Sequence, residues 1–335
     1  MTLDELRAKV SGGAARGVHA APDGVRRGVG RAGRWLTRAA DVPGPPVWTS
    51  PPLPVPVGTT EDDVRALLDS VSVDGAPPAE LAAYAADAFG RLLHTWGMVA
   101  VEHGRALEIG ANLYFMTVLL AEHTSLELEL TNWFGDGRPD TLVQVVEYTE
   151  PAAGKSRRLE LTSSLVDIER AAMPYEDDVF DLVVFCEVLE HLTEDPLAAL
   201  VEIRRVLRPG GVLVLTTPNV ARLENVVRMV LGENIYDPYS GYGPTGRHNR
   251  EYSRHELHLL LEHVGFAVED SFTADAHPDV APLLPRYAEV APLVTFRSPD
   301  LGQHLFVRAR LAAEPCPGRP AWLFRSYPEG EIATG

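Results

Sequence analysis

The sequence predicts an α/β fold built on a doubly wound, mostly parallel sheet, with a helical cap on its N-terminal side. From Arg105 onward, short β-type runs alternate with helical patterns, which is typical of a parallel sheet covered on both faces. An apolar strand, ALEIG at 106–110, turns through Gly110 into the helical run LYFMTVLLAEH. A Pro-Gly-Gly turn at 209–211 precedes a second apolar strand, GVLVLTTP.

The composition is that of a soluble globular protein. The 335 residues are 45% hydrophobic and 23% charged, values usual for a folded domain. No apolar run reaches the roughly 18 to 20 residues that cross a bilayer, and the start MTLDELRAKV is too charged for a signal peptide, so we expect a cytoplasmic protein without a transmembrane segment. Cys186 and Cys316 are the only cysteines, so no disulfide framework is expected. The formal net charge of −17 argues against a nucleic-acid partner.

Four parts are expected along the chain. They are a basic arm with a proline-rich linker (1–58), a helical cap (59–103), the sheet domain (104–312) and a C-terminal tail (313–335). The first part holds eight Lys and Arg against four Asp and Glu, so the basic surplus lies there. A solvated arm is favoured, and contact with a membrane surface, a partner or a second copy of the chain is the alternative.

The elements follow in order. Thr60 and the acidic residues after it predict a helix start, and a second helix is predicted from Pro78 to about Met98. Strands are predicted at ALEIG, LELELTNW, FDLVVFCE, GVLVLTTP and HLFVRAR. Two further runs, TLVQVVEYT and RLELTSSLVD, surround the turn PAAGKS between residues 141 and 166. This pattern predicts a hairpin inserted in the sheet order.

Residues 173–219 carry the most specific motifs. FDLVV forms a strand, EHL follows it, and Leu-x-Pro-Gly-Gly precedes the next strand. This segment resembles the class I S-adenosylmethionine-dependent methyltransferases, whose fourth strand, following helix and fifth strand carry these motifs. The resemblance implies a seven-stranded, Rossmann-like methyltransferase sheet and S-adenosylmethionine as the methyl donor.

The same resemblance implies a cofactor site at the ends of the first strands. Asn112 stands where the family usually has a second glycine, and Asn132 is the substitute for the acid that usually holds the ribose hydroxyls. Asp167 is expected near the adenine. A plain strand-to-helix turn would use Gly110 equally well. The implied cofactor contacts are Glu108, Gly110, Asn112, Asn132, Asp167 and Cys186.

The motif CEVLEHL places Glu187, Glu190 and His191 at i, i+3 and i+4, which is one face of a helix. It resembles the ExxEH motif of metal-dependent small-RNA 2′-O-methyltransferases and of ubiquinone-pathway O-methyltransferases, where these side chains hold a divalent cation. His248, in RHNREYSRHEL, is then the fourth ligand, and Mg²⁺, Mn²⁺ and Zn²⁺ are the candidates. Without a metal, Glu190 and His191 line the cofactor pocket, and His191 or His248 is the natural catalytic general base.

Residues 232–257 interrupt the fold after GVLVLTTP and are rich in tyrosine and glycine. Loops at this edge of a parallel sheet usually carry the acceptor site, and a structural loop is the alternative. This segment and TTPNVARLEN resemble uncharacterised methyltransferases of bacterial glycan and secondary-metabolite gene clusters. The expected substrate contacts are Tyr242, Arg247, Asn249 and Tyr252.

We therefore expect O-methylation of a sugar or of a glycosylated secondary metabolite, a small-molecule or carbohydrate acceptor. Two alternatives stay open. One is N- or C-methylation of a small metabolite, which the fold permits equally. The other is a catalytically silent, methyltransferase-like scaffold, suggested by Asn112 and by the missing ribose acid.

Overall fold

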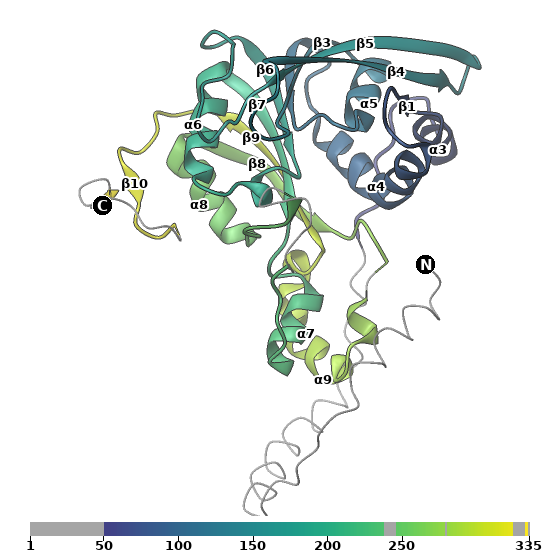
Figure 1. Cartoon of the computed structure of the whole chain (residues 1–335). Coiled ribbons are helices and arrows are strands. Elements are labelled where there is room, and N and C mark those ends of the chain that lie inside the picture. The colour runs from purple at the N-terminus through teal and green to yellow at the C-terminus, as the bar shows by residue number, and fades with distance from the viewer. Residues whose placement is uncertain (1–49, 238–245, 279, 324–331, 334–335) are drawn as a thin grey trace, which may run out of the picture. The chain divides into compact units, whose positions relative to one another are not determined.

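Nine strands form the central sheet (Figure 1), in the order β1-β4-β5-β3-β2-β6-β7-β9-β8. The computed structural model describes residues 50–237, 246–278, 280–323 and 332–333. The predicted arm, most of its linker and Tyr242 lie outside this part of the chain. The strands are β1 (Ser72–Val73), β2 (His103–Ile109), β3 (Ser125–Asn132), β4 (Thr141–Glu150), β5 (Lys155–Leu165), β6 (Phe180–Cys186), β7 (Leu207–Pro218), β8 (Phe266–Ala274) and β9 (His304–Leu311).

The sheet is mostly parallel, as predicted. Strands β5, β3, β2, β6 and β7 run parallel to their neighbours, and β9 is antiparallel to both β7 and β8. The predicted hairpin forms between β4 and β5, with Thr141 opposite Ser164 and Glu150 opposite Lys155. The expected number of seven strands was wrong, because the short β1 and the edge strand β8, which the sequence did not predict, bring the sheet to nine strands.

Helices cover both faces of the sheet (Figure 1). Consecutive strand residues point to opposite faces. Accordingly Val212 and Val214 of β7 pack into one core, whereas Leu213 and Leu215 pack into the other. The two predicted cap helices both form and, together with α5, pack into the first core; α6 and α8 pack into the second. These helices are α3 (Glu61–Asp69), α4 (Pro78–Met98), α5 (Phe115–His123), α6 (Pro196–Val206) and α8 (Arg254–Val264).

Helix α3 begins at the predicted start, after Thr60, and the structure shows a complete capping box there. The Thr60 hydroxyl accepts a hydrogen bond from the Asp63 amide at 3.2 Å, and the Thr60 amide donates to the Asp63 carboxylate at 2.9 Å. We expect Thr60→Ala to lower the free energy of unfolding by about 1 kcal/mol. Urea denaturation would measure this loss. The exposed Thr149, outside any helix start, provides the control Thr149→Ala, and equal losses in both variants would contradict the capping role.

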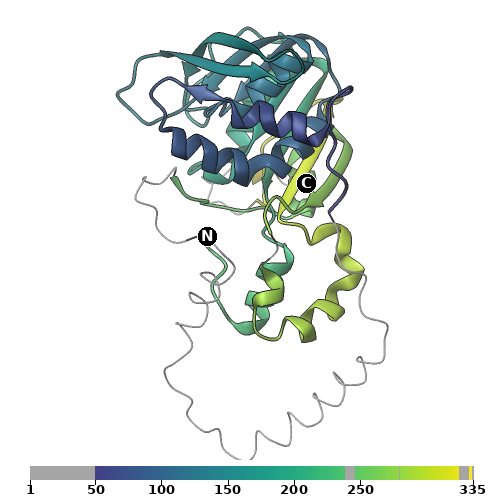
Figure 2. The ribbon, with the colours of Figure 1, turned by 90° about the vertical axis from the view of Figure 1, so that its right-hand side faces the viewer.

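A small helical lobe lies beyond the carboxyl end of β7 (Figure 2), and the sequence did not predict it. It has its own core, which includes Leu223, Val227 and Leu284. The Asn219 side-chain amide ties the chain before the lobe to the chain after it, donating to the carbonyl oxygens of Asp300 and Gly302 at 2.8 Å. Its elements are α7 (Leu223–Leu231), η4 (Ala281–Leu283), α9 (Tyr287–Val290) and η5 (Ala291–Asp300).

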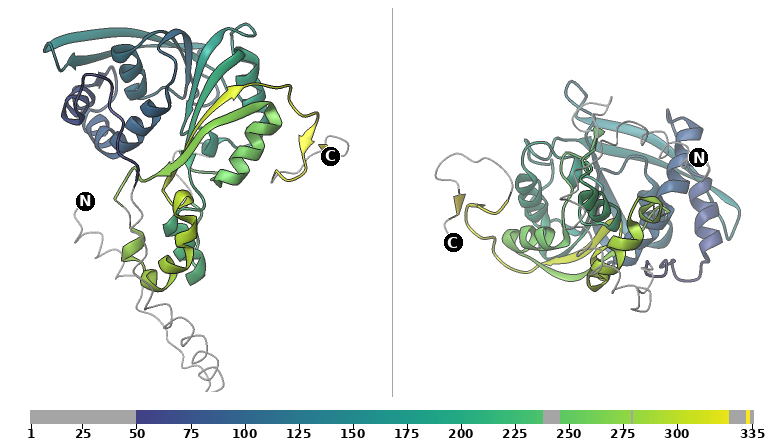
Figure 3. Two further views of the ribbon diagram at one scale, coloured as in Figure 1. Left: turned by 180° about the vertical axis from the view of Figure 1, so that it is seen from behind. Right: turned by 90° about the horizontal axis from the view of Figure 1, so that it is seen from below.

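The C-terminal segment after β9 packs beside α8 (Figure 3). The Cys316 amide donates to the His263 carbonyl at 2.8 Å, and His263 Nε2 lies 2.9 Å from the Gly318 carbonyl oxygen. Strands β10 (Arg319–Pro320) and β11 (Ile332–Ala333) then pair in parallel. Among the described residues, no helix combines the length and the apolar character needed to span a bilayer.

Candidate functional site

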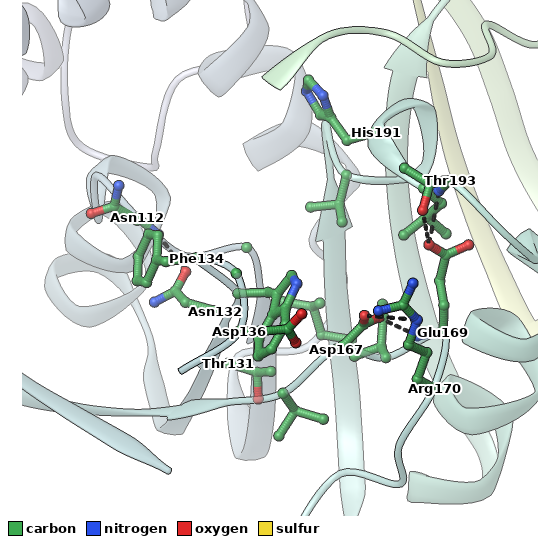
Figure 4. A pocket seen from close by; sticks show the side chains of 18 of the residues that line it. Asn112, Thr131, Asn132, Phe134, Asp136, Asp167, Glu169, Arg170, His191 and Thr193 are labelled. Carbon is green, nitrogen blue, oxygen red and sulfur yellow. Dashed lines mark hydrogen bonds and ion pairs between the residues drawn. The ribbon is translucent and has the colours of Figure 1, made fainter. Parts of the chain in front are cut away.

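A cavity of about 760 Å³ opens at the carboxyl ends of β2, β3 and β6. Four of the six predicted cofactor residues line it: Gly110, Asn112, Asn132 and Asp167. Figure 4 shows Asn112 and Asn132 on one side of the cavity and Asp167 with Arg170 on the other. These four residues lie together because parallel strands bring their carboxyl ends to one edge of the sheet.

The turn after β2 requires glycine. Gly110 has a φ of +78°, in the left-handed region, and a Cβ atom there would lie 2.4 Å from the Val188 side chain. Beside this turn, the Asn112 amide donates to the Asn132 side-chain oxygen at 2.9 Å, and the Asn132 side-chain amide donates to Ser163 at 3.0 Å. Asn132 is therefore fixed in the cavity wall at the end of β3.

Sequence reasoning missed three residues of the wall. Trp133 and Phe134 follow β3 directly, and Asp136 comes two residues later; all three line the cavity. The signal was the WFGDG stretch, in which two aromatic residues and a carboxylate follow the end of a predicted strand. Two aromatic rings and a carboxylate here suit a ligand with a planar base and hydroxyl groups.

Glu108 and Cys186 lie behind the wall, so a direct contact with a cofactor is not supported for either side chain. Glu108 is buried and accepts a hydrogen bond from the Thr117 hydroxyl at 2.6 Å. Burial raises the pKa of Glu108 to about 8. Burial also raises the pKa of the Cys186 thiol to about 12, so this thiol stays protonated at neutral pH.

The sequence predicted that Glu187 shares one helix face with Glu190 and His191. The structure does not form this face. Glu187 has a φ of +54°, and the turn after it is a 3₁₀-helix over Leu189–His191 rather than an α-helix. One Glu187 oxygen accepts from the Thr216 hydroxyl at 2.8 Å, and the other lies 3.2 Å from His304 Nδ1 and 3.9 Å from Arg91 Nε.

These partners fix the charge of Glu187. Burial alone would raise the pKa of Glu187, but the neighbouring His304 and Arg91 outweigh it and hold that pKa well below its ordinary value. Glu187 also lines the cavity. The structure therefore places an ionised carboxylate in the cavity wall.

Glu190 is fully buried and points to the other face of the sheet. Its Oε2 accepts from the Thr217 hydroxyl at 2.9 Å, whereas Thr216, the preceding residue of β7, holds Glu187. Because consecutive strand residues face opposite sides, Thr216 and Thr217 hold the two carboxylates on different sides of β7. Burial, and then the charge of Glu187, raises the pKa of Glu190 to about 8. Within the described residues, Glu190 Oε1 has no hydrogen-bond partner.

Three of the four predicted metal ligands come together: Glu190, His191 and His248 have ligand atoms within 4.8 Å of one another. Glu187 belongs to neither of the groups of this kind that the described residues form. A four-ligand site that includes Glu187 is therefore corrected to a three-residue cluster. We call Glu190, His191 and His248 the EHH cluster.

The two histidines of the EHH cluster differ in their surroundings. His191 Nδ1 lies 2.9 Å from the Arg247 carbonyl oxygen, so this nitrogen carries the proton and Nε2 faces Glu190 at 3.9 Å. Burial and the neighbouring His248 lower the pKa of His191. Burial also disfavours the charged form of His248, but its hydrogen bond to Glu251 and nearby carboxylates outweigh this and raise its pKa.

The predicted substrate residues that the structure describes lie in different surroundings. The Asn249 side-chain amide donates to the His191 carbonyl at 3.0 Å, and Arg247 Nε donates to Asn249 Oδ1 at 3.2 Å. Both residues thus support the turn that carries His191. Tyr252 is 1% exposed and packs in the second core. Its predicted contact with an acceptor was wrong, because β-type pairing with Asn219 pulls it inward.

A second cavity, of about 920 Å³, adjoins the first at the EHH cluster. His191 lines the first cavity, His248 lines the second, and Thr193 lines both. The rings of His191 and His248 lie 5.2 Å apart, edge to face. The cluster can therefore act on a group that reaches it from either side.

The comparisons with known proteins agree with this geometry. Residues 144–271, from β4 to β8, match a family model described as a methyltransferase domain. A stretch of 101 residues is 38% identical to a probable S-adenosylmethionine-dependent methyltransferase of Mycolicibacterium smegmatis and covers 30% of this chain and 34% of the relative. A stretch of 95 residues is 37% identical to the mitochondrial ubiquinone biosynthesis O-methyltransferase of rat, over 28% of this chain and 26% of the relative. The chain thus spans about a third or less of the length of these curated relatives.

Solved structures show lower similarity. An S-adenosylmethionine-dependent methyltransferase from Mesorhizobium loti is 18% identical, with a TM-score of 0.40 over 67% of this chain and 97% of its own. A putative methyltransferase of Haloferax volcanii, solved with its Trm112 activator, is 19% identical, with a TM-score of 0.43 over 69% of this chain and 96% of its own.

Proposed function

We propose that this chain is an S-adenosylmethionine-dependent methyltransferase that methylates a hydroxyl oxygen on a sugar or glycosylated metabolite. The position of the first cavity carries the proposal. It lies at the carboxyl end of β2, where the strand order runs through β3 and β5 on one side and through β6 and β7 on the other. Open α/β sheets bind their ligands at such a switch point. The methyltransferase-domain match over residues 144–271 supports the same assignment.

The residues of the first cavity fit this cofactor. Gly110 lets the backbone approach a ligand closely, and Trp133 and Phe134 offer apolar rings to an adenine. Asp136 and Asp167 can accept hydrogen bonds from the ribose hydroxyls and the adenine amino group. Glu187 adds a negative charge that can pair with the ammonium group of the methionine part.

The EHH cluster suits the removal of the acceptor's proton. When bound, S-adenosylmethionine supplies an electrophilic methyl group. Since the hydroxyl must lose its proton as its oxygen takes up that group, a base is needed beside it. His191 Nε2 carries no proton in the neutral tautomer that its Nδ1 contact selects, so it can accept this proton.

Divalent-cation binding at the EHH cluster is the second candidate mechanism. The buried Glu190 Oε1, without a hydrogen-bond partner among the described residues, supports it. One carboxylate and two imidazoles suit Zn²⁺ or Mn²⁺ better than Mg²⁺, which prefers oxygen ligands. Such an ion would lower the pKa of a bound hydroxyl group.

Calorimetric titration with S-adenosylhomocysteine, before and after chelator treatment and with metal analysis of the same sample, tests this proposal. Binding with a stoichiometric ion that is lost in His248→Ala, but retained in the exposed control His255→Ala, would support cation binding. Binding without an ion would support His191 as the base. No binding would overturn the proposal and favour the scaffold alternative.

Gly110→Ala is expected to weaken S-adenosylhomocysteine binding by at least about tenfold, which is a loss of about 1.4 kcal/mol. The new Cβ would collide with Val188, which also lines the cavity. Gly137→Ala is the matched control, because Gly137 has the same φ of +78° but nothing within 4 Å of its Cβ position. Calorimetry on both variants checks the expectation. Equal affinities would contradict a cofactor site at this turn.

A further inference from the structure

The second cavity is built from two segments that lie far apart in the sequence. Ile235, Tyr236 and Asp237 form one part of its wall, and Ala321, Trp322 and Leu323 of the C-terminal segment form another. No role was predicted for the C-terminal segment from the sequence. Its position in this wall makes it part of the site rather than an appendage.

The C-terminal segment is held firmly in this place. Leu323 is 2% exposed and belongs to the second core, beside residues of α6 and α8. Arg319 forms an ion pair with Asp195, which caps the start of α6. The Cys316 amide also donates to the His263 carbonyl, and the Gly318 carbonyl oxygen lies beside the His263 ring. These contacts fix the segment before and after Trp322.

Two aromatic side chains of this wall remain exposed. Trp322 is 42% exposed and Tyr236 is 78% exposed, although large aromatic side chains are usually covered in a folded protein. Both line the same cavity, together with the polar Asp237 and Asn249. Aromatic faces pack against the C–H face of a sugar ring, while carboxylates and amides bind its hydroxyl groups. Such a combination suits a sugar better than a long apolar chain.

The charged side chains of the wall favour an uncharged sugar over an anionic one. Asp237, Glu251 and Glu256 all line the cavity. Arg250 pairs with Glu256, and Glu251 lies 3.1 Å from His248 Nδ1 and also pairs with Arg222. Asp237 accepts a hydrogen bond from the His248 amide at 3.2 Å and lies 3.7 Å from His248 Nδ1, so carboxylates outnumber the cationic groups among the residues that line this wall. This wall repels an anionic ligand and accepts an uncharged one.

We propose that the second cavity is the acceptor site for an uncharged pyranose ring, and that Trp322 of the C-terminal segment is the surface on which the ring stacks. His248 lines this cavity and also belongs to the EHH cluster, so a hydroxyl of the stacked ring can reach the groups that remove its proton. The assignment of the ring as methyl acceptor rests on the proposed function. The sugar site itself rests on the wall alone.

Saturation-transfer difference NMR with methyl α-glucopyranoside and methyl α-glucuronide, on the full chain, tests this proposal. We expect a signal for the glucoside, and binding of the glucuronide weaker by about tenfold or more because of its carboxylate. Trp322→Ala should remove the glucoside signal. The control Phe296→Ala, which removes an 80% exposed aromatic ring on the helical lobe, should retain it. Catechol serves as a planar, non-sugar competitor.

Three outcomes would overturn the sugar site. They are no glucoside signal in the unaltered protein, an undiminished signal in Trp322→Ala, and binding of catechol in place of the glucoside. Trp322→Phe guards against a merely structural effect, since it should retain most of the signal. Titration with S-adenosylhomocysteine on the same samples separates this proposal from the proposed function. Trp322-dependent glucoside binding without cofactor binding would refute only the methyl transfer, and the reverse would refute only the sugar site.

Discussion

Replacement of Arg91 by Met is expected to lower the free energy of unfolding by about 3 to 5 kcal/mol. Arg91 is 8% exposed, its Nε lies 3.9 Å from the Glu187 carboxylate, and its Nη2 donates to the Tyr84 hydroxyl at 2.8 Å. Without Arg91, the Glu187 side chain, which is only 17% exposed, would keep His304 as its one remaining ion-pair neighbour among the described residues. The loss reflects the cost of a buried, poorly compensated charge. Urea denaturation of the two proteins at neutral pH measures it.

A double-mutant cycle separates this cause from lost packing. Glu187→Gln, introduced into Arg91→Met, should recover part of the stability, because it removes the uncompensated charge. The control Arg158→Met removes an exposed arginine, whose side chain is 57% exposed beside Glu147. This control should cost less than about 1 kcal/mol. Additive losses for Arg91→Met and Glu187→Gln would contradict the charge pairing.

A second large effect is expected from His94 at acidic pH. His94 is 1% exposed, and its ring packs against Phe272 and Phe306. Neither ring nitrogen has a hydrogen-bond partner among the described residues. Burial lowers the pKa of His94 from 6.5 to about 4. The folded protein therefore holds this imidazole neutral.

The sign of the pH effect follows from proton uptake. Well above pH 6.5, His94 is neutral in both the folded and the unfolded state, so it adds no pH dependence to the free energy of unfolding. Between pH 6.5 and 4 the unfolded chain binds a proton at His94 and the folded chain does not, so the free energy of unfolding falls with pH by up to about 3 kcal/mol. His94→Leu should remove this part of the acid sensitivity. The exposed His103 provides the control His103→Leu.

Urea denaturation of His94→Leu and of the unaltered protein at pH 7 and at pH 4.5 tests this expectation. The variant should gain stability relative to the unaltered protein as the pH falls, whatever its loss of packing at pH 7. His103→Leu should show no such gain. A stability difference between His94→Leu and the unaltered protein that stays constant with pH would show that His94 titrates normally in the fold.

The sequence by itself determined the sheet, its hairpin, the cap helices and much of the first cavity. Apolar runs and turn residues reveal the periodicity of each element, because this periodicity depends only on residues that are close in the sequence. The cavity residues Gly110, Asn112, Asn132 and Asp167 follow from this pattern. Gly110 and Asn112 follow β2, Asn132 ends β3 and Asp167 follows β5. The carboxyl ends of these parallel strands meet at one edge. The capping box at Thr60 is a local signal of the same kind.

Only the tertiary structure decided which side chains meet across the site. Spacing placed Glu187 beside Glu190, but the left-handed backbone at Glu187 and the alternation of Thr216 and Thr217 in β7 separate the two carboxylates. Arg91 and His304 contact Glu187 from segments far away in the chain, and Trp322 and Tyr236, from two distant segments, line one cavity. The core of the helical lobe likewise joins distant segments, because its residues come from both sides of β8 in the sequence. Periodicity describes an element and its buried face, whereas contacts between distant elements depend on strand order, register and packing.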